Sequence, residues 1–327
     1  MIYPRRLLSA IKKQISSKQI VVVTGMRRVG KTTLYRHIFE QIPSDNKVFL
    51  DIENPIDQKL FEETDYNNII ANLRRYHIDP QKKIYLFLDE IQAMPQIIHA
   101  IKYLYDHYQI KFFVTGSSSF YLKNVFPESL AGRKFIFTLY PLDFEEFLIF
   151  KNIKKTANTT FYEKAQNKNI FEFEKLKKQY EEYIHYGGFP EVVLENSSSQ
   201  KELIITDIFK SYFEKEVKIL ADFGKLAVFR DCILLLMQRA GSKLEIAKLS
   251  SELGISRDTV YSYLAFLEGT YFIHLIKPFT KNRDREVSGT RKIYFCDSGL
   301  LNLFAKISEG ALFENTVFHD LIKYGNL

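Results

Sequence analysis

A glycine-rich loop near the amino end constrains this chain more than any other feature of its sequence. Residues 25–32 read Gly-Met-Arg-Arg-Val-Gly-Lys-Thr and match the pattern G-x-x-x-x-G-K-[ST]. A β-branched run, residues 20–24, comes before the loop, and apolar residues spaced four apart follow it, as on one face of a helix. The sequence therefore predicts a strand, a tight loop and a helix in that order. At average amino-acid frequencies such a match arises by chance in about one chain in a hundred of this length.

The residue types of this loop suit the binding of phosphate. Glycine lets the backbone turn so that successive N–H groups point at phosphate oxygens, and the start of the next helix adds partial positive charge. We expect Lys31 to contact the β- and γ-phosphates and the Thr32 hydroxyl to ligate Mg²⁺. Arg27 and Arg28, inside the loop, are both candidates to contact phosphate or a partner. The candidate nucleotide-binding residues of the loop are Gly25, Arg27, Val29, Gly30, Lys31, Thr32 and Thr33.

An acidic pair ends a second apolar run. Residues 86–90 read Leu-Phe-Leu-Asp-Glu, so a buried strand would deliver Asp89 and Glu90 at its carboxyl end. Beside a phosphate loop, Asp89 would hold Mg²⁺ through water, and Glu90 would act as the general base that polarises the attacking water. The competing interpretation is an acidic strand end without a role.

Hydroxyl side chains end a third apolar run, residues 110–116. Thr115 and Ser117 are both candidates to sense the γ-phosphate or to orient water, and the sequence does not rank them; either one also suits an ordinary strand end. An Asn-Lys-x-Asp sequence, typical of GTP-specific proteins, does not follow this run. ATP or ADP with Mg²⁺ is therefore the expected ligand.

The amino-terminal half alternates apolar runs with helix-like stretches. Near-continuous hydrophobic strands that alternate with helices indicate a parallel α/β sheet with helices on both faces. We expect residues 1–150 to form this nucleotide-binding core, because residues 151–178 turn rich in Lys and Asn. The remaining strands of the sheet are expected at 47–53, 84–91, 110–116 and 133–142.

The carboxy-terminal half is expected to be mostly helical. Residues 151–222 would form a linker and a helical lid, and residues 243–254 and 256–269 would form a helix-turn-helix around Gly254. Two short apolar runs follow and flank a polar stretch, as the strands of a hairpin wing would. We therefore expect a winged helix over residues 223–308.

Composition sets the class of protein and the compartment. With 46% hydrophobic and 26% charged residues in 327, the chain can bury ordinary cores and is not a disordered, collagenous or coiled-coil protein. Only two cysteines, both in apolar contexts, favour a reducing compartment, and no apolar run is long enough to cross a membrane. We expect a cytoplasmic protein. The net charge of +7 favours an anionic partner without naming one.

Five segments in order carry a resemblance to a known family. GMRRVGKTTL, LFLDEIQ, VTGSSSFYL, SLAGR and YPLDFEEF resemble the AAA+ ATPases of bacteria and archaea in which a P-loop core precedes a winged helix and a restriction-endonuclease-like domain. The resemblance covers nearly the whole chain. It implies that residues 309–327 are only the start of the last domain, which is either truncated or lost, so we expect no nuclease site at Glu314.

The resemblance also implies two further site residues. In that family a Gly-x-Pro of the lid approaches adenine, which points to Gly188 and Pro190; a plain turn is the alternative. An arginine in the place of Arg133 contacts the γ-phosphate, from its own subunit or from a neighbour, and would act in catalysis with Lys31 and Glu90; a surface ion pair is the alternative.

These expectations combine into an ATPase that couples nucleotide state to movement of the winged helix, with DNA as a candidate partner. Basic residues of the wing and Arg257 would contact DNA, or the module would only pack against the lid. One alternative is a slow nucleotide switch or DNA-binding regulator with little turnover, and a metabolic kinase is a weaker one. A protein partner and a homo-oligomer remain open. The basic wing residues are Lys277, Lys281, Arg283, Arg285, Arg291 and Lys292.

Overall fold

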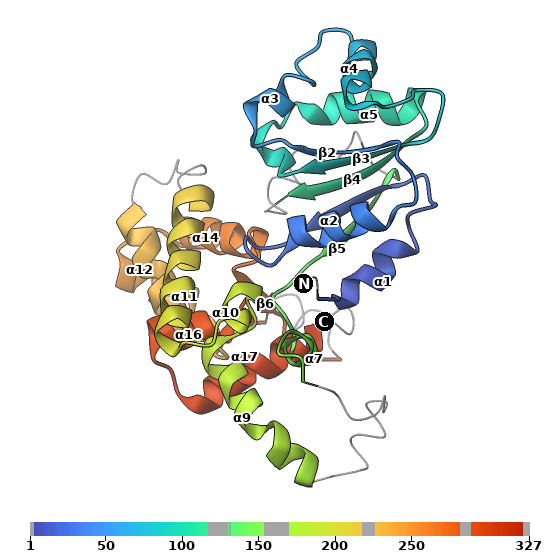
Figure 1. Ribbon diagram of the computed structural model, residues 1–327. Helices are drawn as coiled ribbons and strands as arrows, with labels where there is room; N and C mark the ends of the chain where they lie inside the picture. Colours follow the sequence, from blue (N-terminus) through green and yellow to red (C-terminus); the bar gives the residue numbers. More distant parts are fainter. Residues whose placement is uncertain are drawn as a thin grey trace. The chain divides into compact units, whose positions relative to one another are not determined.

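The chain folds as two units, Met1–Leu139 and Tyr140–Leu327 (Figure 1). They are seen in a computed structural model that describes residues 3–116, 130, 132–153, 170–217, 226–281 and 289–322. The division falls directly after the last strand of the first unit. The expected lid and winged helix thus both belong to the second unit.

The first unit is a parallel five-stranded sheet in the order β2-β3-β4-β1-β5, which confirms the predicted α/β class. β4 lies between β1, which leads into the glycine-rich loop, and β3, which ends in the acidic pair. In a parallel sheet all carboxyl ends meet at one edge, so the strand order decides which strand ends are neighbours. The strands are β1 (Ile20–Thr24), β2 (Lys47–Asp51), β3 (Ile84–Asp89), β4 (Ile110–Gly116) and β5 (Lys134–Thr138).

Helices cover both faces of this sheet. One face buries aliphatic side chains such as Leu86 and Leu88 against α4 and α5, and the other packs the rings of Phe87 and Phe113 under Tyr35 of α2. Strand residues alternate in direction, so neighbours in β3 serve opposite layers. The helices are α1 (Arg6–Lys12), α2 (Lys31–Gln41), α3 (Pro55–Gln58), α4 (Asn67–Leu73) and α5 (Ile97–His107), with 3-10 turns η1 (Arg74–Tyr76) and η2 (Ile91–Ala93).

The second unit is mainly helical, as predicted. A capping box starts α7: Asp143 accepts from the backbone N–H of Glu146, whose side chain accepts from that of Asp143. Proline at the first position starts α10. The helices are α7 (Phe144–Phe150), α9 (Ile170–Tyr186), α10 (Pro190–Leu194), α11 (Ser198–Tyr212), the π-helical turn η3 (Phe213–Val217), α12 (Leu226–Met237), α13 (Ile246–Leu253), α14 (Arg257–Gly269), α16 (Ser298–Ala305) and α17 (Glu309–Ile322).

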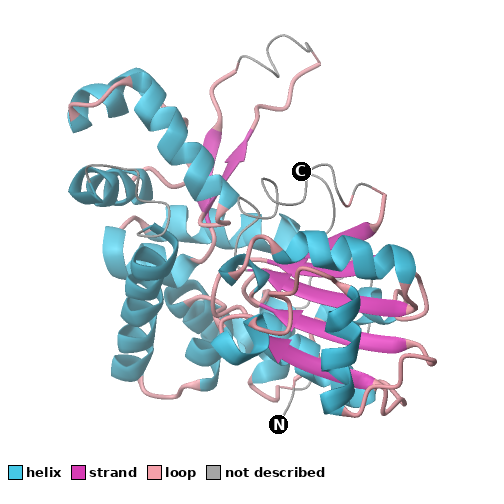
Figure 2. Cartoon of the chain, turned by 90° about the horizontal axis from the view of Figure 1, so that it is seen from above, coloured by secondary structure: helices cyan, strands magenta, loops and turns pink. Residues whose placement is uncertain are grey.

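A two-helix turn and a hairpin follow one another in this unit (Figure 2). α13 ends at Gly254 in the left-handed conformation (φ +63°), and the Ser256 side chain caps α14 by accepting from the Thr259 N–H. The hairpin consists of antiparallel β6 (Ile273–Ile276) and β7 (Lys292–Phe295). The predicted succession of helix, turn, helix and hairpin is therefore present.

Candidate functional site

The glycine-rich loop has the backbone that its sequence predicts. Gly25 has φ +139° and Gly30 φ +94°, and a Cβ on Gly25 would lie 2.1 Å from the carbonyl oxygen of Leu139. A side chain at Gly25 would therefore collide with the chain just after β5. The Arg5 guanidinium fixes the far side of the loop, because Nη1 donates to the Val29 carbonyl at 2.7 Å. Glycine at position 25 is thus a requirement of packing as well as of turning.

Lys31 places a positive charge inside the loop. Its side chain is buried, and Nζ donates to the carbonyl oxygens of Gly25 at 3.0 Å and of Met26 at 3.1 Å. Arg27, in contrast, points its guanidinium at the Glu53 carboxylate, 3.4 Å away. The ammonium group of Lys31 is therefore the cation that the loop itself encloses.

Asp89 is joined to the loop through hydroxyl groups. The carboxylate is only 4% exposed and accepts from the Thr115 hydroxyl, and a side-chain hydrogen bond also links it to Thr32. Burial raises the pKa of the Asp89 carboxyl, and the hydrogen bonds from Thr115 and Thr32 act in the opposite direction. Asp89, Thr32 and Thr115 therefore form one connected polar cluster at the carboxyl edge of the sheet.

Thr115 also holds Glu90, so one side chain organises both acidic residues. Its Oγ1 donates to Asp89 and accepts from the backbone N–H of Glu90 at 2.9 Å. Glu90 has φ +53°, a conformation that a non-glycine residue adopts only where its surroundings impose it. The Gln92 amide donates to the Glu90 carboxylate. Sequence reasoning considered Thr115 without ranking it and missed Gln92, whose only signal is its place two residues after the acidic pair. Ser117 lies outside the described residues.

Arg133 lies at the amino ends of the strands, whereas the loop lies at their carboxyl ends. It directly precedes β5, and its carbonyl accepts from the N–H of Ile20 at 2.8 Å, at the start of β1. The loop begins after the other end of β1, about 16 Å away at ~3.3 Å per residue. The guanidinium contacts the Asp106 carboxylate at 3.1 and 3.2 Å. The structure therefore does not bring Arg133 to the loop of its own chain.

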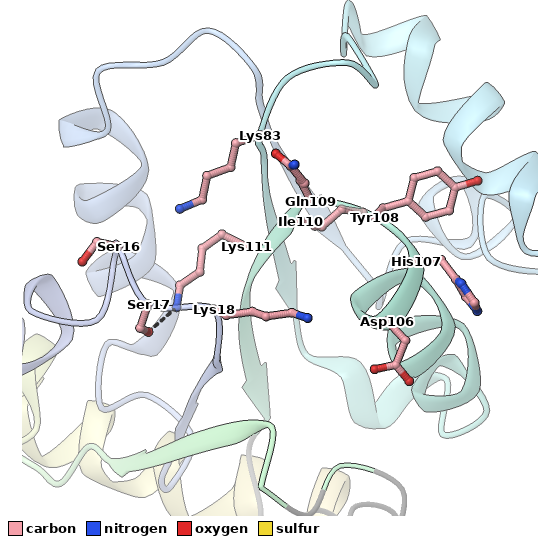
Figure 3. Close-up of a pocket in the computed structure, with 10 residues that line it drawn as sticks. All are labelled: Ser16, Ser17, Lys18, Lys83, Asp106, His107, Tyr108, Gln109, Ile110 and Lys111. Atoms are coloured by element: carbon pink, nitrogen blue, oxygen red, sulfur yellow. Dashed lines mark hydrogen bonds between the residues drawn. The ribbon is translucent and has the colours of Figure 1, made fainter.

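The pocket shown in Figure 3 also lies at the amino ends of the strands, and its volume is about 460 Å³. Lys111 of β4 is buried there, and its ammonium donates to the Ser17 hydroxyl at 3.1 Å and to the Gln19 carbonyl. Burial, with repulsion from Lys83, lowers the pKa of Lys111 to about 8. Lys111 thus holds the segment before β1 through two hydrogen bonds. The pocket is separate from the phosphate loop.

The Gly-x-Pro segment of the second unit is held from two sides. The Gly188 N–H donates to Asp297 Oδ2 at 2.7 Å, and the Gly188 carbonyl accepts from the N–H of Leu142 at 2.7 Å. A Cβ on Gly188 would lie 2.2 Å from the Leu142 carbonyl oxygen, so packing inside the unit already demands glycine there. Pro190 opens α10. This turn is thus tied to the segment directly after β7, which sequence reasoning did not foresee.

Comparison with known proteins agrees with this fold. Residues 17–148 match a family model described as an AAA domain, and residues 177–311 match a domain of unknown function (DUF8612). The chain is 29% identical over 326 residues to an uncharacterized protein of Methanocaldococcus jannaschii, covering 96% of this chain and 69% of the relative. It is 28% identical over 320 residues to one of Haemophilus influenzae, covering 94% of this chain and 75% of the relative.

A solved structure shows the same architecture. A Walker-type ATPase of Pyrococcus abyssi superimposes with a TM-score of 0.55 at 14% identity, covering 93% of this chain and 96% of that one. The chain thus has an AAA-like P-loop ATPase fold. Among the helices of the described ranges, none is long and apolar enough to span a membrane.

Proposed function

We propose that the first unit binds ATP with Mg²⁺ in the loop between β1 and α2 and hydrolyses it. The observation that carries this proposal is a cluster in which Asp89 is hydrogen-bonded to the side chains of Thr32 and Thr115, and Thr115 accepts from the backbone N–H of Glu90. It brings a loop hydroxyl, a buried carboxylate and a second carboxylate to one edge of the sheet. Those are the groups that phosphoryl transfer to water needs beside a phosphate cradle.

The donor set at the loop fits Mg²⁺. This cation favours oxygen ligands, keeps several waters, and is usually held by one or two protein groups together with substrate phosphates. Thr32 and Asp89 supply such oxygens. The metal would neutralise charge on the β- and γ-phosphate oxygens.

Lys31, Glu90 and Thr115 have different roles in the proposed hydrolysis. The ammonium of Lys31 exchanges its contacts with the loop carbonyls for phosphate oxygens and offsets their negative charge. The Glu90 carboxylate accepts the proton of a water that attacks the γ-phosphorus while the bond to the β-phosphate oxygen breaks, so that ADP leaves. Thr115 holds the backbone of Glu90 in the conformation from which the carboxylate reaches that water.

The second unit would respond to the nucleotide. We propose that the Gly188–Pro190 turn contacts adenine and that residues 223–308 act as a winged helix that changes position with nucleotide state. Support comes from the hydrogen bond between Gly188 and Asp297, because Asp297 lies two residues after the end of β7 and so links the turn to the hairpin. DNA is the proposed partner of the wing; Arg283 and Arg285 lie outside the described residues. We propose that Arg133 contacts the γ-phosphate of a nucleotide bound to a neighbouring subunit, not of the one bound to its own chain.

A slow nucleotide switch is the second candidate. It is favoured by the contact of the Gln92 amide with the Glu90 carboxylate, because a hydrogen bond donated to the carboxylate stabilises its charged form and so weakens it as a base. Single-turnover kinetics separates the two functions. Phosphate release on a scale of seconds supports the ATPase, and ADP retained over many minutes supports the switch.

Isothermal titration calorimetry tests the binding step. Lys31→Ala should abolish measurable binding of Mg·ATP, since it removes the cation that the loop encloses. Lys13→Ala removes an exposed lysine of the same unit and should bind as the wild type does. Equal affinity of the Lys31→Ala variant and the wild type would refute the proposed site.

A further inference from the structure

An exposed face follows β6 in the hairpin of the second unit. Residues 277–281 read Lys-Pro-Phe-Thr-Lys, and in Figure 2 they belong to the pink trace that continues beyond the magenta strands. Lys277, Phe279 and Lys281 are exposed, whereas Pro278 and Thr280 are partly buried. Exposed side chains thus alternate with partly buried ones up to Lys281, where the chain bends.

Among the residues that the structure describes, Phe279 is the most exposed large apolar residue. Its side chain is 100% exposed, compared with 78% for Phe171 and 69% for Ile56. Pro278 fixes its own φ and biases Lys277 toward an extended backbone, so the residues just before the ring have little conformational freedom. Folding gains nothing from a ring left in water, and the two lysines beside it make the ring part of a surface that suits a ligand.

The charge around the ring indicates the kind of ligand. An ammonium group stands on each side of Phe279 along the face, and residues 277–281 contain no acidic side chain. An anion that also offers flat apolar rings complements this arrangement, and nucleic acid has both properties. In a duplex the faces of the bases are covered by their neighbours, so a protruding ring stacks best on an unpaired base.

The neighbouring helix α14 packs against β6 and exposes a second aromatic ring, that of Tyr261, which is 57% exposed. The exposed charges of α14 are Arg257, Asp258 and Glu268, so this helix adds an aromatic side chain but no net positive charge.

We propose that the face Lys277–Phe279–Lys281 binds single-stranded nucleic acid, with a base stacked on the Phe279 ring and backbone phosphates against the two lysines. This inference rests on the nucleic-acid part of the proposed function. It goes further by choosing an unpaired strand over a duplex and by naming a residue outside any recognised motif.

Fluorescence provides a direct test, because the chain contains no tryptophan. Phe279→Trp places a single indole at the proposed contact. A single-stranded oligonucleotide should quench its emission saturably, whereas inorganic polyphosphate, which has charge but no bases, should not. Equal quenching by the matching duplex, a blue shift with vesicles containing anionic lipid, or no change with any probe would overturn the proposal. The blue shift would assign the face to a membrane surface.

Affinity measurements provide a second test. Phe279→Ala should weaken binding of the oligonucleotide in fluorescence anisotropy by roughly 5- to 150-fold, the range that one stacked base supplies. Phe171→Ala, a matched exposed phenylalanine of the same unit, should bind as the wild type does. Replacing both lysines by alanine should lower the slope of log affinity against log salt by about 1.4, at ~0.7 per phosphate contact. An unchanged slope, or equal loss in both phenylalanine variants, would contradict the assignment.

The ATPase assay keeps the two proposals distinguishable. Phe279→Ala should hydrolyse ATP without nucleic acid at the wild-type rate, because the proposed hydrolysis does not use its ring. If the wild type neither binds nor hydrolyses ATP, the proposed function fails, yet the quenching experiment still decides whether Phe279 binds unpaired bases.

Discussion

Asp297 should make the stability of the second unit depend on pH, and Asp297→Asn tests this. Asp297 is only 2% exposed, and its carboxyl group accepts hydrogen bonds from the backbone N–H groups of Gly188 at 2.7 Å and of Gly299 at 2.9 Å. Burial nevertheless raises the pKa of Asp297 from 3.8 to about 7, because loss of water outweighs those hydrogen bonds.

The size of the effect follows from this shift. A carboxyl whose pKa is raised by folding contributes stability that is fully present below its unfolded pKa and is lost as pH rises through the folded value. Between about pH 4 and pH 7 the free energy of unfolding should fall by about 1.4 kcal/mol per pH unit, or ~4 kcal/mol in all, from this group. Burial lowers the pKa of His274 to about 3 and of His319 to about 4, so these residues give the opposite slope on acidification.

Subtracting the variant from the wild type removes the histidine contributions. Asparagine carries no charge, and its amide N–H₂ meets a backbone donor, which costs roughly 1–3 kcal/mol at every pH. The stability advantage of the wild type over Asp297→Asn, measured by urea denaturation, should therefore shrink by about 2 kcal/mol between pH 5 and pH 7. Asp231→Asn changes a carboxylate of α12 that is 55% exposed and should show no such trend. An equal advantage of the wild type at both pH values would refute a buried, titrating Asp297.

Two further predictions concern the nucleotide site. Glu90→Gln should bind Mg·ATP with wild-type affinity in calorimetry but hydrolyse it at least 100-fold more slowly in a rapid-quench single turnover, the usual contribution of a general base; a wild-type rate would remove Glu90 from the mechanism. Gly25→Ala should lower the melting temperature of the first unit, because φ is +139° and the new Cβ would lie 2.1 Å from the Leu139 carbonyl oxygen, and calorimetric melting that matches the wild type would show that the loop tolerates a side chain.

The sequence predicted those elements whose conformation depends on residues adjacent in the chain. The phosphate loop, its strand and its helix were read from adjacent residues, since glycine at positions 25 and 30 and helical spacing after Lys31 act within a few residues. The runs of apolar residues likewise indicated a parallel sheet, because strands buried on both faces need them.

Strand order could not be read in the same way. Thr115 joins Asp89 and Glu90 because β4 lies between β1 and β3, and nothing in the sequence of β4 states which strands it pairs with. The direction of β5 relative to β1, which the sequence does not show either, decided the position of Arg133. It precedes β5, and parallel pairing with β1 then places it at the edge away from the loop.

The sequence by itself determined which residue types stand at the ends of strands and helices. Tertiary structure alone decided which ends meet, as when Gly188 donates to Asp297, 109 residues further along the chain. Local conformation depends on interactions between near neighbours, which a sequence displays. Contacts between distant segments depend on the packing of whole elements against one another, and that packing is fixed only in the folded chain.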